Sequence, residues 1–321
     1  MSRVRIVPLV AAFVGLVMIA PAFAGAKLDI DGQSSIDFGF RVQALTIVQD
    51  EINDADGSVG KVVDWKVRRA RLRVKGTINE YASAFIQTEI GDASGGSGQD
   101  MRVIDAFVTV QKDAWAQLIM GLNMAPANRE NLTSSGAMLA IDRPGTCYKS
   151  LSWGGRVLRT FSNNTISGTN SGLAPGVSVR DLGATLFGSG KVGDNASLKY
   201  YVGVYDGVNV DGTGGTNYEN TPHFGARAQM NFYDAEPGYY NSATYLGKKK
   251  TVGIGASFDA QSKVYVGGTT AAPEDVDYTY FSVDGFTEWP AGQGSLTAEA
   301  GWSMLDFGDV DAFKAAQGCQ S

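Results

Sequence analysis

Apolar and polar residues alternate with a period of two along most of the chain. Successive side chains of a β-strand point to opposite faces, so this period predicts strands with one apolar face and one polar face. Together with a basic stretch at 64–76, the alternating segments predict about eleven strands of about ten residues each. The alternating segments are 36–44, 82–90, 104–111, 116–122, 180–188, 198–204, 224–232, 252–258, 277–287 and 296–304.

The basic stretch at 64–76 carries most of its cations on one face. On one side, at a period of two, stand Arg69, Arg71, Arg73 and Lys75. On the other side stand Ala70, Leu72 and Val74, with Lys66 and Arg68 at the start of the strand. Two interpretations fit this pattern: the charged edge of a soluble sheet, or a membrane strand whose cations face a water-filled lumen. An Arg or Lys facing lipid near the midplane costs about 2–4 kcal/mol, so in a membrane barrel these four cations must face the lumen.

The connections between the predicted strands alternate in length. The short ones fall at 77–80 and 112–113, and the long, polar ones at 50–60, 91–100, 123–179, 207–221 and 261–275. Short turns at one end and long loops at the other are typical of outer-membrane barrels. The connection at 234–249 fits this scheme poorly, because it is too long for a simple turn. The stretch at 123–179 is long enough to predict a functional loop.

The polar faces decide between a soluble sandwich and a barrel. They carry Asp, Glu, Arg and Lys on most strands, and few helices are available to cover the apolar faces. The pattern therefore predicts an all-β fold, a transmembrane antiparallel β-barrel.

The N-terminus has the composition of a secretory signal peptide. Arg3 and Arg5 precede an apolar run at 6–20, and Ala22-Phe23-Ala24 is an A-x-A cleavage site. We expect residues 1–24 to be removed, which leaves a β-domain at 25–321 in an exported protein. No later apolar run is long enough for a transmembrane helix.

Charge and cysteine content exclude little else. The net charge is −6, which gives no reason to expect nucleic acid as a partner. Cys147 and Cys319 could pair in an exported chain, but their spacing matches no metal or redox motif.

Several short blocks of residues stand in a fixed order along the predicted mature chain. They are Arg68-Arg69-Ala70-Arg71-Leu72 with Lys75-Gly76, Asp105-Ala106-Phe107-Val108, Arg180-Asp181-Leu182-Gly183 with Gly188, Leu198-Lys199-Tyr200-Tyr201, and Gly203-Val204-Tyr205-Asp206-Gly207. In order and spacing these blocks resemble the phosphate-selective porin O/P family. The resemblance implies a sixteen-stranded trimeric barrel in the outer membrane of a Gram-negative bacterium. It further implies a third extracellular loop that folds inward and basic side chains that draw anions such as phosphate through the pore.

The chain departs from the family pattern in two ways. Eleven strands is an odd number and no aromatic strand closes the chain, so we expect either a truncated sequence or closing strands that the pattern does not reveal. Carboxylates also fall on the predicted lumen face, which weakens the expected anion selectivity. They are Asp37, Glu89, Asp105, Asp181 and Glu299.

A pore selects by its lining charges and its constriction. The predicted pore-lining residues are Arg41, Arg69, Arg71, Arg73, Lys75 and Arg227. The predicted constriction residues, all within 123–179, are Arg129, Arg143, Lys149, Arg156 and Arg159. The alternative for these loop cations is that they are solvated or paired with Glu130 and Asp142. The expected partners are thus outer-membrane lipid, small anionic solutes and two further copies of the chain.

Two other functional classes remain open. A hydrolase would need His223 as its base, since it is the chain's single histidine, yet no G-x-S-x-G motif accompanies it. No His/Cys cluster has zinc spacing, so we predict neither a metal nor a cofactor, and no enzyme activity. A scaffold barrel that holds a protein partner in its lumen is the third possibility, because glycines leave the inner faces open.

Overall fold

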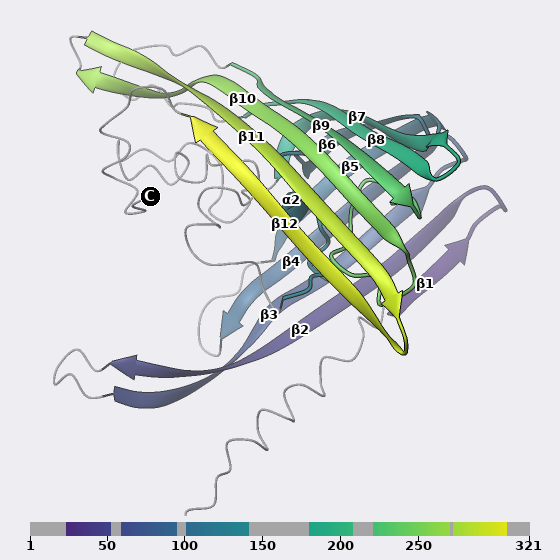
Figure 1. Ribbon diagram of the computed structural model, residues 1–321, viewed down its shortest axis with the longest axis horizontal. Coiled ribbons are helices and arrows are strands. Elements are labelled where there is room, and N and C mark those ends of the chain that lie inside the picture. The colour runs from purple at the N-terminus through teal and green to yellow at the C-terminus, as the bar shows by residue number, and fades with distance from the viewer. Residues whose placement is uncertain are drawn as a thin grey trace, which may run out of the picture. The chain divides into compact units, whose positions relative to one another are not determined.

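The computed structural model describes residues 24–52, 59–94, 101–140, 180–207, 221–269 and 272–306 (Figure 1). These residues form twelve strands and one single-turn helix, and the strands pair in sequence order. The predicted all-β antiparallel fold is confirmed. Among the described residues, no helix is both long and apolar enough to span a membrane. The elements are β1 (Ala24–Asp29), β2 (Ser35–Ile52), β3 (Val59–Thr77), β4 (Ala82–Ser94), β5 (Arg102–Asp113), β6 (Ala116–Met124), α2 (Arg129–Leu132), β7 (Arg180–Gly193), β8 (Ala196–Tyr205), β9 (His223–Tyr233), β10 (Thr251–Thr269), β11 (Ala272–Ala291) and β12 (Gly294–Asp306).

Two differences from the predicted strands have local causes. The twelfth strand is β1, whose six residues include two alanines and a glycine and so carry little alternation. The predicted polar connection at 261–275 is wrong, because β10 and β11 pair as far as Thr269 and Ala272. Their register shifts between Gln261 and Tyr265, and this irregularity breaks the period of two that would have revealed the longer strands.

The chain divides into two compact units. Unit 1 contains the residues up to Ile78 together with Phe85–Ile104, and unit 2 contains Asn79–Ala84 and the residues from Asp105 onward. In unit 2 the antiparallel order places the tight turns at 114–115, 194–195 and 292–293 at one end of the sheet. The connections that follow β6 and β8 start from the opposite end. The connection at 234–250 starts from the tight-turn end.

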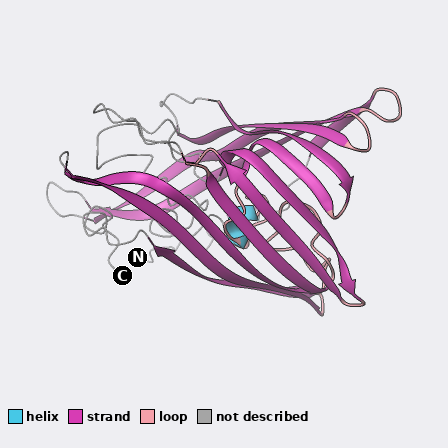
Figure 2. Cartoon of the chain, turned by 90° about the horizontal axis from the view of Figure 1, so that it is seen from above, coloured by secondary structure: helices cyan, strands magenta, loops and turns pink. Residues whose placement is uncertain are grey.

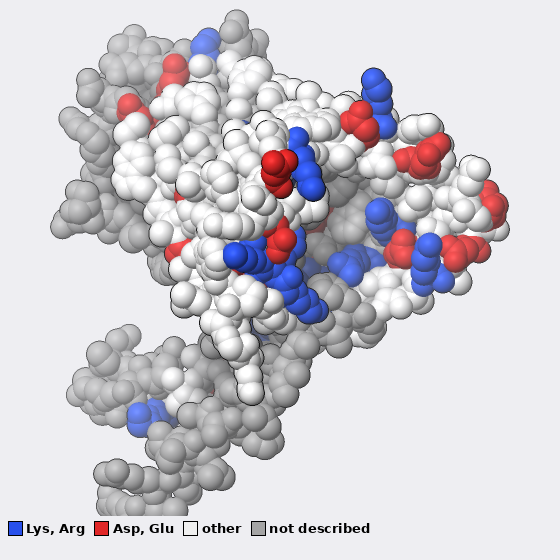
Figure 3. Space-filling view, turned by 45° about the vertical axis from the view of Figure 1, so that its right-hand side comes forward, with Lys and Arg blue, Asp and Glu red and all other residues white. Residues whose placement is uncertain are grey.

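The sheet of unit 2 is polar on its buried face and apolar on its exposed face. On β8 and β9, Lys199, Arg227 and Gln229 are each at most 3% exposed, whereas Val202 and Phe224 are more than half exposed. A water-soluble sheet buries its apolar face instead, so this surface suits lipid. Wide areas of the described surface are uncharged, and the charged side chains gather in restricted patches (Figure 3).

An arginine on the exposed apolar face should test this assignment. We expect Val202→Arg, in β8, to destabilise the protein folded in a bilayer by about 2–4 kcal/mol. The control is Val192→Arg, because Val192 is equally exposed but lies beside the 194–195 turn, where the cost falls to about 0–1 kcal/mol. Urea unfolding from lipid vesicles measures both values. Equal costs at the two positions would contradict a lipid-facing surface.

Candidate functional site

Unit 1 brings five of the predicted pore-lining cations to one face of the β2–β3 pair. Directly paired residues of antiparallel strands share a face. The pairs are Arg41 with Arg71, Gln43 with Arg69, Gly39 with Arg73, and Asp37 with Lys75. We call Arg41, Arg69, Arg71, Arg73 and Lys75 the basic row. Phe40, Val42 and Leu72, on the opposite face, are each about half exposed, as expected for an apolar surface in lipid.

A bulge extends this polar face. The register shifts between Gln43 and Ala44: Gln43 pairs with Arg69 and Ala44 with Val67, so Arg68 is the extra residue and Lys66 pairs with Leu45. An extra residue reverses the sense of alternation beyond it. Lys66 therefore shares the face of the basic row, and the prediction that it lies on the apolar side is wrong. Trp65 turns outward and is 71% exposed.

The carboxylates described on the polar face of unit 1 include those of Glu89 and Asp37. Glu89 accepts a 2.6 Å hydrogen bond from Arg71 Nε, and its other oxygen lies 3.7 Å from Arg102. Asp37 stands opposite Lys75 in the register. A Cβ at Gly39 would lie 3.1 Å from Arg73 Cγ, so the glycine makes room for that arginine stem. The cations of the basic row outnumber the carboxylates described on this face, which gives the described part of the face a net positive potential.

In unit 2, the described part of the predicted constriction loop contains the single-turn helix α2, which is held against β11. Asn128 caps the helix, since its side-chain oxygen accepts a 2.8 Å hydrogen bond from Asn131 N. Its amide also donates to Tyr280 OH on β11 at 2.8 Å. Ser282 Oγ, also on β11, donates to Ala127 O at 2.9 Å. These contacts fix residues 127–132 against the polar face of β11.

Arg129, a predicted constriction residue, is 1% exposed and pairs with Glu236. Its Nη1 and Nη2 donate to the two carboxylate oxygens at 2.9 and 2.7 Å. The sequence points to Glu130 and Asp142 as partners for the loop cations and does not reveal Glu236, which lies 107 residues from Arg129. The sequence feature that could have pointed to this partner is the 234–249 connection, which contains Glu236 and is too long for a simple turn.

Charge around this pair sets its ionisation. Burial raises the pKa of Glu236, but hydrogen bonds from Arg129 and Tyr245 together with nearby positive charge outweigh burial and lower the pKa to about 2. Burial lowers the pKa of Arg129, and Glu236 outweighs it, so the pKa of Arg129 is raised. Both groups are therefore charged across the physiological pH range.

The contribution of Glu236 to stability should depend on pH in a defined window. Its pKa falls from an ordinary 4.5 to about 2 on folding, so its carboxylate stabilises the fold fully above pH 4.5. That stabilisation should be lost as the pH falls from 4.5 to 2. We expect the difference in unfolding free energy between wild type and Glu236→Gln to stay constant above pH 4.5 and to shrink below it. A difference that grows on acidification would contradict the pair.

Arg227, another predicted pore-lining residue, is buried against Asp284. Its Nη1 and Nη2 donate to the two oxygens of Asp284 at 2.6 and 2.7 Å. A Cβ at Gly255 would lie 2.7 Å from Arg227 Cζ, so this glycine provides the space for the guanidinium. Arg227 is therefore on the polar face of unit 2, with its charge balanced by a carboxylate.

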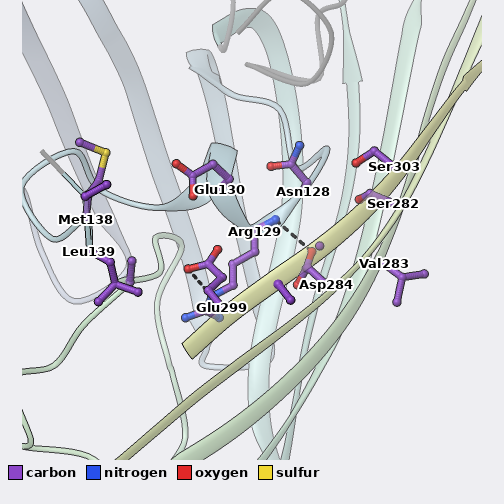
Figure 4. Close-up of a pocket in the computed structure, with 14 residues that line it drawn as sticks. Asn128, Arg129, Glu130, Met138, Leu139, Ser282, Val283, Asp284, Glu299 and Ser303 are labelled. Atoms are coloured by element: carbon purple, nitrogen blue, oxygen red, sulfur yellow. Dashed lines mark hydrogen bonds and ion pairs between the residues drawn. The ribbon is translucent and has the colours of Figure 1, made fainter. Parts of the chain in front are cut away.

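A cavity of about 270 Å³ lies beside these groups, between residues 128–140 and strands β11 and β12 (Figure 4). Glu130, Asp284 and Glu299 contribute carboxylates to its lining. Arg129 Nε lies 3.9 Å from Glu299 Oε2. The cavity lining thus combines acidic side chains with the buried Arg129, whose charge is paired with Glu236.

His223, the base that a hydrolase would require, is fully buried between two aspartates. Its Nδ1 lies 3.0 Å from Asp181 Oδ2 and its Nε2 lies 2.7 Å from Asp259 Oδ2. Both ring nitrogens therefore face carboxylates and not a serine hydroxyl. Among the described residues, no group of three or more His, Cys, Asp and Glu side chains is placed to hold a metal ion.

The remaining predictions fall outside the described residues. They concern Arg143, Lys149, Arg156, Arg159, Cys147, Cys319 and the signal peptide up to residue 23. The strand β1 begins at Ala24, one residue before the predicted start of the mature chain.

Comparison with known proteins places the chain in a family. The family model of phosphate-selective porin O and P matches residues 40–316. Among solved structures, Salmonella typhi OmpF in complex with daunomycin is 12% identical, with 89% of this chain and 83% of that chain covered and a TM-score of 0.43. Vibrio cholerae OmpT, folded in vitro and in its trimer form, is 13% identical, with 85% and 78% covered and a TM-score of 0.37. Comparison with curated proteins gave no match. Since the family model spans most of its length, the chain belongs to the phosphate-selective porin O and P family.

Proposed function

We propose that the protein is a passive diffusion channel of the Gram-negative outer membrane that prefers small anions such as phosphate. The observation that carries this proposal is the basic row, five cations on one face of β2 and β3 with Glu89 and Asp37 as the carboxylates described beside them. Low-dielectric walls focus such a field on a passing anion. The guanidinium fork suits phosphate and carboxylate oxygens.

The preference for anions is expected to be weak. Carboxylates of unit 2, among them Glu130 and Glu299, line the cavity beside residues 128–140. Arg129 and Arg227 are each balanced by a carboxylate and add little net field. We assign the constriction to the 123–179 loop, with Arg143, Lys149, Arg156 and Arg159 as its further cations. We also propose cleavage of residues 1–24, insertion into outer-membrane lipid and assembly as a homotrimer, as the family resemblance implies.

Charge reversal in the basic row tests this proposal. Arg73→Glu should lower the anion-to-cation permeability ratio at least about fivefold, because one unit charge about 4 Å from an ion is worth about 1 kcal/mol in water and the reversal changes the charge by two units. Reversal potentials in planar bilayers under a KCl gradient measure the ratio. Lys191→Glu is the control, since the charge change is the same but Lys191 is exposed beside the 194–195 turn. Equal ratios in wild type and Arg73→Glu would remove the basic row from the mechanism.

A further inference from the structure

Two segments reach the same polar face of unit 2 from opposite ends of its sheet. Residues 125–140 follow β6 at the long-connection end, and residues 234–250 join β9 to β10 at the tight-turn end. Both are buried where they meet: Leu132 is fully buried, and Asn241 is 1% exposed. Figure 2 shows α2 lying against the strands of this unit.

The two segments pair through their backbones. Thr133 and Asn241 form a parallel β-bridge. Asn241 N donates to Leu132 O at 2.9 Å, and Ser134 N donates to Asn241 O at 3.1 Å. A third bond runs from Ala243 N to Ala137 O at 2.7 Å. The position of residues 132–137 is therefore defined by the connection that enters from the other end.

Glu236 is the strongest link between the segments. It accepts two hydrogen bonds from the Arg129 guanidinium and three more, from Gln229, Asn231 and Tyr245. Arg129 also donates to Ser242 O at 2.8 Å. Removing one partner of a buried ion pair leaves the other charge buried and unpaired. The pair therefore strongly favours the arrangement in which the two segments are in contact.

The 234–250 segment is itself fixed to the strands. Lys199 Nζ donates to Asn241 Oδ1 at 2.5 Å, and Tyr201 OH donates to Tyr239 O at 2.7 Å. Glu288 of β11 accepts hydrogen bonds from Tyr245 N and Gly247 N at 2.7 and 2.9 Å. The aromatic ring of Tyr239 packs edge-on against Tyr201. A segment anchored in this way can hold another one in place.

We propose that residues 234–250 are a latch that holds residues 125–140, the described beginning of the proposed constriction loop, in place, and that Glu236 and Arg129 are its positioning residues. The inference rests on the proposed function, because it takes residues 125–140 to be part of the constriction. It goes beyond that function by assigning control of the aperture to a connection from the opposite end of the sheet.

Single-channel recording of Glu236→Gln tests the latch. With the charge removed, we expect the frequency of closures and partial-conductance steps to rise at least about tenfold, because loss of one partner of a buried pair is worth more than a tenfold change in an equilibrium. Arg129→Met should behave alike, and the double variant Arg129→Met/Glu236→Leu should be no worse than either single change. Glu80→Gln is the matched control, because Glu80 is an exposed glutamate in the 78–81 turn.

A cross-link keeps the proposal testable if these variants fail to fold. In a Cys147→Ser/Cys319→Ser background, Thr133→Cys and Asn241→Cys place thiols at the two bridge partners. The oxidised channel should retain the wild-type open current and close less often, and reduction should reverse the effect. Failure of the pair to cross-link, loss of current on oxidation, or wild-type gating in Glu236→Gln would each overturn the latch. A wild-type channel that conducts anions would at the same time leave the proposed function standing, so the two failures are distinguishable.

Discussion

Replacing Asp284 with alanine should lower the free energy of unfolding by about 3–5 kcal/mol, because it leaves the Arg227 guanidinium buried without its carboxylate. Arg227 is 3% exposed and cannot regain water without moving out of the sheet face. Asp284 also accepts a 3.1 Å hydrogen bond from Arg129 N, so its loss also loosens the start of α2. Equilibrium unfolding in urea from lipid vesicles measures the change.

The matched control is Asp277→Ala in the same strand. Asp277 is exposed, so its replacement should cost less than about 1 kcal/mol. In the double variant Asp284→Ala/Arg227→Met, most of the lost stability should return, because no charge is then left unpaired. A cost for Asp284→Ala as small as that of the control would show that the Arg227 charge does not depend on this carboxylate.

Replacing Gly188 with alanine should prevent the formation of folded protein. A Cβ at Gly188 would overlap the carbonyl oxygen of Trp115 and lie 2.5 Å from its carbonyl carbon. These are backbone atoms of the turn between β5 and β6, and that turn is fixed to β7 by a 2.8 Å bond from Ser189 N to Ala114 O. Backbone atoms cannot move aside as a flexible side chain can, so the cost should exceed the roughly 1–3 kcal/mol of ordinary overpacking. The yield of the heat-modifiable folded form on gels measures the effect.

Gly193→Ala, in the same strand, provides the control for this prediction. The nearest atom to a Cβ at Gly193 is Ala196 Cβ at 4.0 Å, which is an ordinary van der Waals contact. We therefore expect the wild-type yield from that variant. Normal folding of Gly188→Ala would show that the 114–115 turn is free to shift on β7.

The fold was predictable from sequence wherever the period of two runs unbroken. In β8 and β9 every second residue faces the same side. The alternation of Val202 and Val204 with Lys199 in β8, and of Phe224 with Arg227 in β9, therefore indicated both the strands and their faces. Bulges hid the rest. The extra residue at Arg68 moved Lys66 to the polar face, and the shift after Gln261 disguised the far halves of β10 and β11.

The candidate site was predictable only in part, for a related reason. The basic row lies on adjacent strands in regular register, so spacing alone placed its members together. Arg129 and Glu236 are joined by tertiary packing of two irregular segments, and no local pattern connects them. Spacing also does not show that Arg227 is balanced by Asp284, because the charge on a face depends on partners from other strands.

The two units carry different charge arrangements, and this difference bears on selectivity. In unit 1 the cations of the basic row exceed the carboxylates Glu89 and Asp37. In unit 2 the described arginines of the polar face are matched by carboxylates, as in the pairs of Arg129 with Glu236 and of Arg180 with Asp105. In the proposed channel, a passing ion would therefore respond mainly to the basic row.

The sign of the reversal potential of the wild-type channel tests the central claim most directly. Purified protein in a planar bilayer separates two KCl solutions of different concentration, and the voltage of zero current is recorded. We predict a reversal potential with the sign for anions and a modest permeability ratio. A reversal potential with the sign for cations, or a folded protein that passes no current, would contradict it.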